Sequence, residues 1–221
     1  DQAVARARKV LDRLPNRCIV TVAQDVSGVV LPAVGTPCQN PVGGPGATVD
    51  ADAVRACLIA ALETRYSGSA DHRTANDAAY AEAMRAVHQQ FPADLDIAML
   101  YVESMMDLRP WGYWMPDGQP HEGTREIVAL TEQVLAKHPK HPGALHMLIH
   151  LLEPTSMPER AETAADTLMP LMPAAGHMVH MASHIYQRVG RYADAMKSNQ
   201  LAIEADEDYI TQCRAQGLYP M

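Results

Sequence analysis

The stretch His146–His184 reads HMLIHLLEPTSMPERAETAADTLMPLMPAAGHMVHMASH, and the rest of the chain is best interpreted outward from it. It carries two groups of polar side chains at helical spacing: His146, His150 and Glu153 at i, i+4, i+7, then His177, His180 and His184 at i, i+3, i+7. Each group lies along one side of one α-helix. Residues 154–173 are long enough to turn, run back as a second helix and turn again. We therefore expect the two histidine faces to lie side by side.

A shift of 34 residues superimposes the second face on the first. It carries His146 onto His180, His150 onto His184, Met147 onto Met181, and Ala161 onto Ala195. This period in a helical chain is the length of a tetratricopeptide repeat. An earlier turn, FPADLD at 91–96, resembles HPKHPG at 138–143. Aligning those turns places Glu103 opposite His150 and His184, with Asp107 one helical turn further on, so three successive first helices are expected to face one groove.

Several segments resemble a group of bacterial tetratricopeptide-containing proteins with histidine-rich repeats. They are DLRPWGYW, HPGALHMLIHLLE, PERA and AGHMVHMASHIYQRVGRYADA. The resemblance covers roughly residues 51–221, and it implies the fold and the histidines but no reaction. Relatives of this kind continue past GLYP into another helical pair with further histidines. A chain segment beyond Met221 is therefore one expected partner of the groove.

The predicted fold class is all-α, a tetratricopeptide-like solenoid of helical hairpins over residues 51–221. Alanine, leucine and methionine are abundant and there is one phenylalanine, which favours helix over sheet. Helices are expected at 51–66, 73–91, 94–108 and 124–138, followed by those that carry the histidines. Residues 1–50 form a separate N-terminal segment: a helix over 2–14 ended by Pro15, a small β-hairpin, and a glycine- and proline-rich loop over 35–46.

Composition excludes several classes of protein. The net charge of −8 argues against a nucleic-acid partner, and no apolar run approaches the ~20 residues of a membrane span. The four cysteines form no CxxC pair, so a cysteine zinc site is not expected; Cys18 and Cys38 are either disulfide-bonded or free thiols. The chain lacks an initiating Met, which suggests a processed or trimmed product. With the bacterial resemblance, we expect an exported or periplasmic location over a cytoplasmic one.

The histidine faces predict a transition-metal site. Helical histidines at i and i+4 hold two donor nitrogens in place before an ion arrives. The candidate ligands are His146, His150, His177, His180 and His184. Met147 follows His146, so the HExxH pattern of zinc proteases is absent. Copper, zinc, iron and manganese all remain open. Methionines 147, 178 and 181 would favour copper if they turned inward, but core packing is the favoured interpretation.

Three carboxylates are candidate catalytic residues: Glu103, Asp107 and Glu153, each as a base, a ligand or a group that orients a ligand. The alternative for Glu103 and Asp107 is a solvated or salt-bridged helix face. Trp111, Tyr113 and Trp114 either wall a substrate pocket or pack against the solenoid edge, the second being favoured. The histidines without spacing partners are expected to be solvent-exposed: His72, His88, His121, His138 and His141.

The leading functional hypothesis is a metal-binding protein, and more specifically a metal-dependent enzyme that acts on a small molecule in the groove. Two others compete with it: a protein- or peptide-binding scaffold, and a metal carrier or assembly factor. Fold alone does not choose among them. Elemental analysis separates the first from the second, and ease of metal release to a chelator separates the carrier from the enzyme.

Overall fold

The computed structural model describes residues 51–66 and 70–213. Within that part of the chain, all regular elements are helical. The predicted fold class, an all-α solenoid of tetratricopeptide-like helical hairpins, is confirmed. The α-helices are α2 (Ala51–Arg65), α3 (Arg73–Gln90), α4 (Leu95–Met106), α5 (Thr124–Lys137), α6 (Pro142–Leu152), α7 (Glu162–Leu168), α8 (Gly176–His180), α9 (Ala182–Arg188) and α10 (Tyr192–Cys213). Two 3₁₀ turns, η1 (Ala70–His72) and η2 (Pro158–Ala161), precede α3 and α7.

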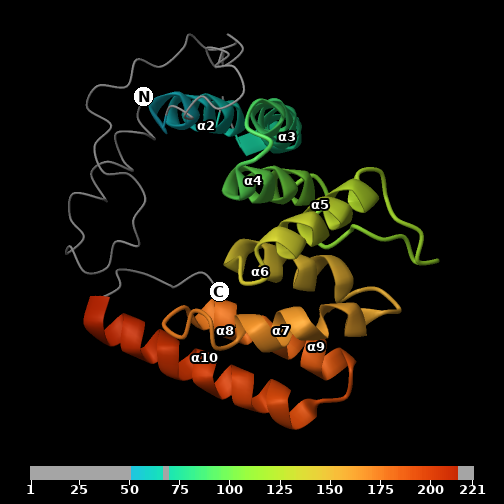
Figure 1. The fold of residues 1–221 in the computed structure, drawn as a ribbon, viewed down its shortest axis with the longest axis vertical. Coiled ribbons are helices and arrows are strands. Elements are labelled where there is room, and N and C mark those ends of the chain that lie inside the picture. Colours follow the sequence, from blue (N-terminus) through green and yellow to red (C-terminus); the bar gives the residue numbers. More distant parts are fainter. Residues whose placement is uncertain (1–50, 67–69, 214–221) are drawn as a thin grey trace.

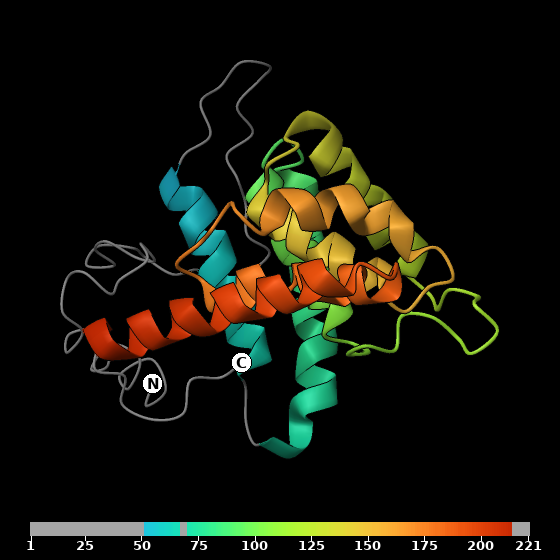
Figure 2. The same ribbon diagram turned by 90° about the horizontal axis from the view of Figure 1, so that it is seen from below.

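Consecutive helices pack as hairpins that stack along the long axis of the molecule (Figure 1). The pairs are α2 with α3, α4 with α5, α6 with α7, and α8–α9 with α10. The first helices of neighbouring hairpins also touch, α4 against α6 and α6 against α9. Helix α10 runs across the C-terminal end of this stack, as the view from below shows (Figure 2). The first helices α4, α6 and α8–α9 therefore follow one another in space in the order that the sequence predicts.

Local signals in the sequence fix the helix starts. The Asp94 carboxylate accepts a hydrogen bond from the Ile97 amide at the start of α4. At the start of α6, His141 Nδ1 accepts from the Ala144 amide at 3.3 Å, and Pro142 occupies the first helical turn. Gly190, at φ +83°, makes the turn between α9 and α10 in a backbone conformation that other residues rarely adopt.

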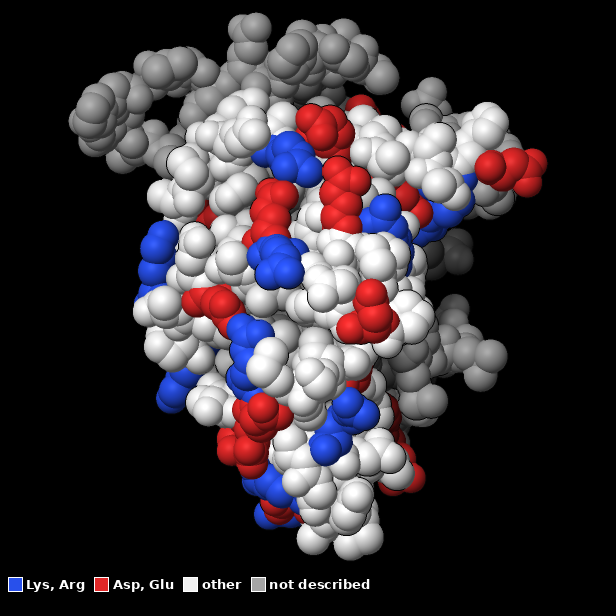
Figure 3. Space-filling view, turned by 90° about the vertical axis from the view of Figure 1, so that its right-hand side faces the viewer, with Lys and Arg blue, Asp and Glu red and all other residues white. Residues whose placement is uncertain are grey.

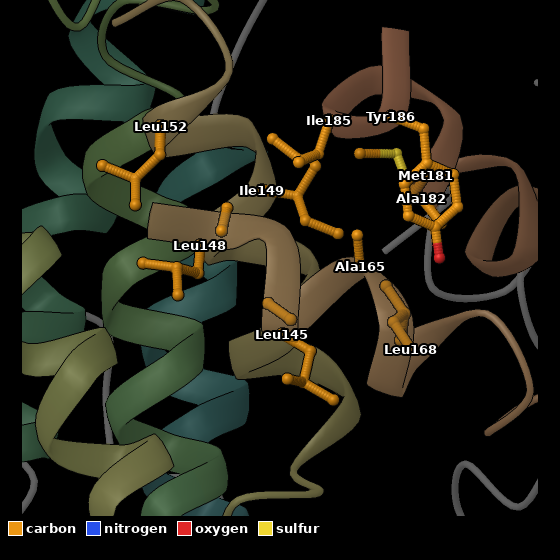
Figure 4. Close-up of a cluster of buried hydrophobic side chains, with 12 residues drawn as sticks. Leu145, Leu148, Ile149, Leu152, Ala165, Leu168, Met181, Ala182, Ile185 and Tyr186 are labelled. Atoms are coloured by element: carbon orange, nitrogen blue, oxygen red, sulfur yellow. The ribbon is translucent and has the colours of Figure 1, made fainter. Parts of the chain in front are cut away.

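The apolar core beside the histidines sets the spacing of the first helices. Leu145, Leu148, Ile149 and Leu152 of α6 pack with Ala165 and Leu168 of α7 and with Met181, Ala182, Ile185 and Tyr186 (Figure 4). Ile149 and Ile185 are fully buried. Each buried aliphatic side chain of this size contributes roughly 1.5–3 kcal/mol relative to exposure. This contact holds α6 against α9, and the polar faces of both helices are thereby brought together.

The histidine-bearing helix differs from its prediction in one respect. His177, His180 and His184 were expected on one continuous helix, but it is divided at Met181 into α8 and α9. The His184 amide bonds to the Met181 carbonyl at 3.3 Å, a tightened i to i+3 turn. Met181 keeps right-handed helical angles, so the direction of the chain is retained and the three histidines stay on the same side.

The insertion between α4 and α5 packs against the solenoid edge, the favoured interpretation. Trp114 Nε1 donates to the Leu151 carbonyl at 2.7 Å, and Thr124 Oγ1 donates to the Tyr113 carbonyl at 2.8 Å. Tyr113 is buried, whereas Trp111 is 72% exposed. The insertion is thus anchored through Tyr113 and Trp114.

The predictions for residues 1–50, including the N-terminal helix, the hairpin and the Cys18–Cys38 pair, fall outside the described residues. Cys57 of α2, which the sequence did not single out, takes part in a disulfide. In the described ranges no helix has the length and apolar character to cross a membrane. On the face of Figure 3, acidic and basic side chains are interspersed.

Candidate metal centre

Five imidazoles from three helices form one closed ring in the groove, and we call these residues the imidazole cluster. Helix α6 supplies His146 and His150, α8 supplies His177 and His180, and α9 supplies His184. The ring centroids follow one another at 4.8 Å (His146–His150), 5.9 Å (His150–His184), 4.8 Å (His184–His180), 6.3 Å (His180–His177) and 5.0 Å (His177–His146). The convergence of the two histidine faces, expected from the sequence, is present in the structure.

Two pairs of ring nitrogens face each other in this cluster. His146 Nε2 lies 3.2 Å from His177 Nε2, and His180 Nε2 lies 2.9 Å from His184 Nε2. Imidazole nitrogens bind zinc at ~2.0–2.1 Å. Two such donors on one ion are then separated by about 2.9 Å at a right angle and about 3.3 Å at the tetrahedral angle. The observed separations match the spacing of two neighbouring donors on a shared cation.

Hydrogen bonds to the opposite ring nitrogens determine which atoms of the rings are free. Glu153 is the C-cap residue of α6. One of its carboxylate oxygens accepts a hydrogen bond from His150 Nδ1 at 3.2 Å, and the other accepts one from His184 Nδ1. A carboxylate only accepts, so each of these Nδ1 atoms carries the proton. His180 Nδ1 likewise donates to Asn199 Oδ1 at 2.6 Å. The Nε2 atoms of these three histidines are therefore left as lone-pair donors.

Burial and charge keep the cluster in the protonation state that a metal needs. Burial, followed by the positive charges that His150, His177 and His184 would carry, lowers the pKa of His146 to about 3. Burial also lowers the pKa of His177, with its histidine neighbours adding to the effect. Burial alone would raise the pKa of Glu153, but the hydrogen bonds from His150 and His184 outweigh it and lower that pKa to about 2. At neutral pH, His146 and His177 are neutral and Glu153 is ionised.

The cluster is enclosed but remains open to solvent on one side. The side chains of His150 and Glu153 are each 16% exposed, and that of His184 is 27% exposed. Donor atoms that all lie within 4.8 Å of one another belong either to His146, His150 and His177 or to His150, Glu153 and His184. Three donors with an open position are the arrangement that binds an ion and leaves room for water or a small molecule.

The other predicted carboxylates occupy a different part of the groove. Asp107 Oδ2 lies 2.6 Å from Arg65 Nη2, and Arg65 Nε lies 3.2 Å from Asp77 Oδ1. Glu103 has an exposed surface, and its pKa is raised first by desolvation of the carboxylate and then by the charge of Asp107. Among the described residues, no hydrogen bond or ion pair joins Glu103 or Asp107 to the imidazole cluster. For Asp107 the salt-bridged alternative describes the structure.

The methionines next to the histidines pack into the core. Met181 is fully buried in the apolar cluster of α6, α7 and α9, and Met178 packs against the same cluster. Met147 packs against the cluster formed by α4, α5 and α6. These positions agree with the favoured core interpretation and offer no thioether set for copper(I).

Three of the remaining histidines depart from the expectation of solvent exposure. His88 is half-buried and stacks on Tyr101 at 5.6 Å between ring centroids, and burial lowers its pKa. The side chain of His141 is 12% exposed because it caps α6, and its Nε2 lies 3.2 Å from Asp96 Oδ1. His72 and His138 are exposed as expected, and His121 is half-buried.

Sequence reasoning missed two residues of α10 beside the cluster. Asn199 holds His180, as described above. Asp206 lies so close to Gly176 that a Cβ at that glycine would stand 2.1 Å from its Oδ1, and its charge acts on His177. Both belong to the second helix of their hairpin, whereas the histidine pattern concerns first helices. The sequence signal that could have indicated them is a row of polar residues at helical spacing along one side of α10.

Similarity to known proteins is confined to solved structures. A scan against protein-family models found no match, and neither did a search of curated proteins. Among solved structures, the chain is similar to one described as MamA MSR-1 C2. The similarity has a TM-score of 0.46 and 18% sequence identity, and covers 72% of this chain and 81% of that chain. It concerns the arrangement of the helices alone.

Proposed function

We propose that this protein binds a transition-metal ion through neutral imidazoles in the groove of its helical solenoid. The observation that carries the proposal is the pair of Nε2 atoms of His146 and His177 at 3.2 Å, with His150 as a third donor within 4.8 Å. Nitrogen-only donors with nearby carboxylate suit zinc, copper(II) or iron(II). The buried methionines disfavour copper(I).

Glu153 has an orienting role in this proposal. Both of its oxygens receive imidazole Nδ1 atoms, so it fixes the rings of His150 and His184 and raises their basicity. Of the roles open to this carboxylate from the sequence, orientation fits best, because a general base needs a free oxygen directed at a substrate. Glu103 and Asp107 lie apart from the cluster and have no role in metal binding here.

The test is metal content measured on protein made without a polyhistidine tag. Protein equilibrated with Zn²⁺ and then passed over a chelating resin should retain stoichiometric zinc. The variants His146→Gln and His177→Gln should each lose the zinc ion bound at this pair, since either change removes one nitrogen of the 3.2 Å pair. His138→Gln is the matched control, because His138 is exposed and lies outside the cluster. Wild-type protein free of zinc, or a zinc content that both cluster variants leave at the wild-type value, would leave the protein-binding scaffold as the remaining hypothesis.

The same experiment separates a carrier from an enzyme. A carrier must release its ion, so zinc should pass to a soluble competing chelator within minutes. An enzyme retains its ion during turnover. The open side of the cluster, where His184 is 27% exposed, would admit a small molecule to an ion in either case.

A further inference from the structure

The imidazole cluster contains more donors than one ion can use. Its two facing pairs, His146–His177 and His180–His184, are separate in space. Two groups of described residues have donor atoms that all lie within 4.8 Å of one another: His146, His150 and His177, and His150, Glu153 and His184. Neither group contains both facing pairs. Donors on one tetrahedral ion are only about 3.3 Å apart. A single ion at His146 and His177 therefore leaves His180 and His184 without a cation.

The His180–His184 pair is also the less stable of the two when empty. Asn199 Oδ1 accepts the Nδ1 proton of His180, and Glu153 accepts that of His184. Both Nε2 atoms therefore present lone pairs, and they do so 2.9 Å apart. Two acceptors facing each other at this distance repel unless a positive charge lies between them. The charge is either a shared proton or a metal ion.

We propose that the His180–His184 pair is a second metal position, so that the groove holds two divalent transition-metal ions. This inference rests on the proposed function. The first ion is bound by His146, His177 and His150, and the second by His180 and His184 with water completing its coordination. Glu153 joins the two positions, because one of its oxygens orients His150 of the first and the other orients His184 of the second.

Asn199 is a positioning residue for the second ion alone. Its side chain fixes His180 from helix α10, and among the described residues no hydrogen bond joins it to the His146–His177 pair. Loss of an orienting partner of this kind typically weakens metal binding 10- to 100-fold. Asn199→Leu should therefore weaken the second ion selectively. Asn199→Asp keeps an oxygen that accepts the Nδ1 proton and should restore binding.

The experiment is a Zn²⁺ titration of the tag-free full chain, followed by calorimetry and by native mass spectrometry. We expect two zinc ions in the wild type and in the His138→Gln control. One ion is expected in His180→Gln, and the remaining ion in that variant should be lost on adding His146→Gln. Asn199→Leu should weaken only the second binding step by 10- to 100-fold, with Asn199→Asp near the wild type.

The possible failures are distinguishable. One zinc ion in the wild type, lost in both His180→Gln and His146→Gln, would overturn the second position and keep the proposed function. No zinc in the wild type would overturn both. A proton shared by His180 and His184 would appear in the metal-free protein as a strongly deshielded ¹H resonance that survives addition of zinc, and that result would also overturn the second position. A circular-dichroism melting curve checks that each variant is folded.

Discussion

The two halves of the groove satisfy their polar side chains in opposite ways. In the N-terminal half, Arg65 lies between Asp77 and Asp107, so positive and negative groups neutralise each other. In the C-terminal half, five imidazoles and one carboxylate converge with lone pairs directed at one another and with no Lys or Arg among them. The first arrangement pairs its carboxylates with guanidinium groups, and the second sets imidazole nitrogens against one another. This difference is the reason to place the ligand site at one end of a repeated structure.

The largest effect should come from breaking the N-terminal network. Arg65→Met removes the one cation that contacts both Asp77 and Asp107, whose side chains are only 11% and 26% exposed. Asp77 keeps its ion pair with Arg73 at 2.8 Å, but Asp107 loses its ion-pair partner, which should lower the free energy of unfolding by about 2–3 kcal/mol. Urea unfolding of the metal-free protein measures this loss of free energy of unfolding. The zinc content of the variant should equal that of the wild type.

Arg55→Met is the matched control in the same helix. Arg55 pairs with Asp52 at 2.9 Å, but both side chains are well exposed, so the change should cost no more than about 0.5 kcal/mol. Equal effects of the two substitutions would contradict the view that the N-terminal network is a structural ion pair. Loss of zinc in Arg65→Met, with the fold intact, would contradict the separation of the two halves.

Next in size is the effect of changing the carboxylate that joins the histidines. Glu153→Gln keeps the shape but offers one accepting oxygen where two are needed for His150 and His184. One of those rings must then turn or change its tautomer. We expect zinc affinity to fall 10- to 100-fold, measured by competition with a chromogenic chelator. Glu132→Gln, whose partner Arg160 lies on the surface, should leave the affinity unchanged.

A smaller effect is predicted for the pH dependence of metal-free stability. The pKa of His146 is about 3 in the folded chain, below its ordinary value of 6.5. The neutral ring is thus favoured by folding, so its contribution is complete above pH 6.5 and is lost as pH falls toward 3. Between pH 7.5 and 5 the wild type should lose about 1–2 kcal/mol more than His146→Gln.

That pH interval avoids the carboxylate that orients the histidines. The pKa of Glu153 is about 2, so its contribution is lost below its ordinary 4.5. The raised pKa of Glu103 acts in the opposite direction, but equally in both proteins, and so cancels from the difference. Parallel pH profiles for the wild type and His146→Gln would show that folding does not depress the pKa of this ring.

The same two halves show what helical periodicity can predict. The 34-residue shift predicted the hairpins and the convergence of His146, His150, His177, His180 and His184, because a repeated sequence repeats the direction of its side chains. It predicted that Glu103 and Asp107 face the histidines, which stays a prediction, and it could not find Arg65, the partner of Asp107. Periodicity gives the face of a helix, whereas a partner 42 residues away in a less regular hairpin depends on packing.

Helical periodicity also could not predict three details of the C-terminal half. Asn199 belongs to α10, whose groove-facing residues carry no repeated motif, so its bond to His180 appears only in three dimensions. The interruption at Met181 changes the hydrogen bonding of one turn but keeps the histidines on one side of the helix. The spacing of the histidines in the sequence therefore does not indicate it. His141 looked like a turn residue because its capping bond to the Ala144 amide is formed by its ring.

The central claim is that imidazole Nε2 atoms converge on a cation, and X-ray absorption at the zinc edge tests it most directly. For the zinc-loaded, tag-free chain we predict a first shell of nitrogen and oxygen at about 2.0–2.1 Å, with the outer-shell scattering of at least two imidazole rings. His146→Gln combined with His180→Gln should abolish that signal. A sulfur shell near 2.3 Å, or zinc with only oxygen neighbours, would contradict the account.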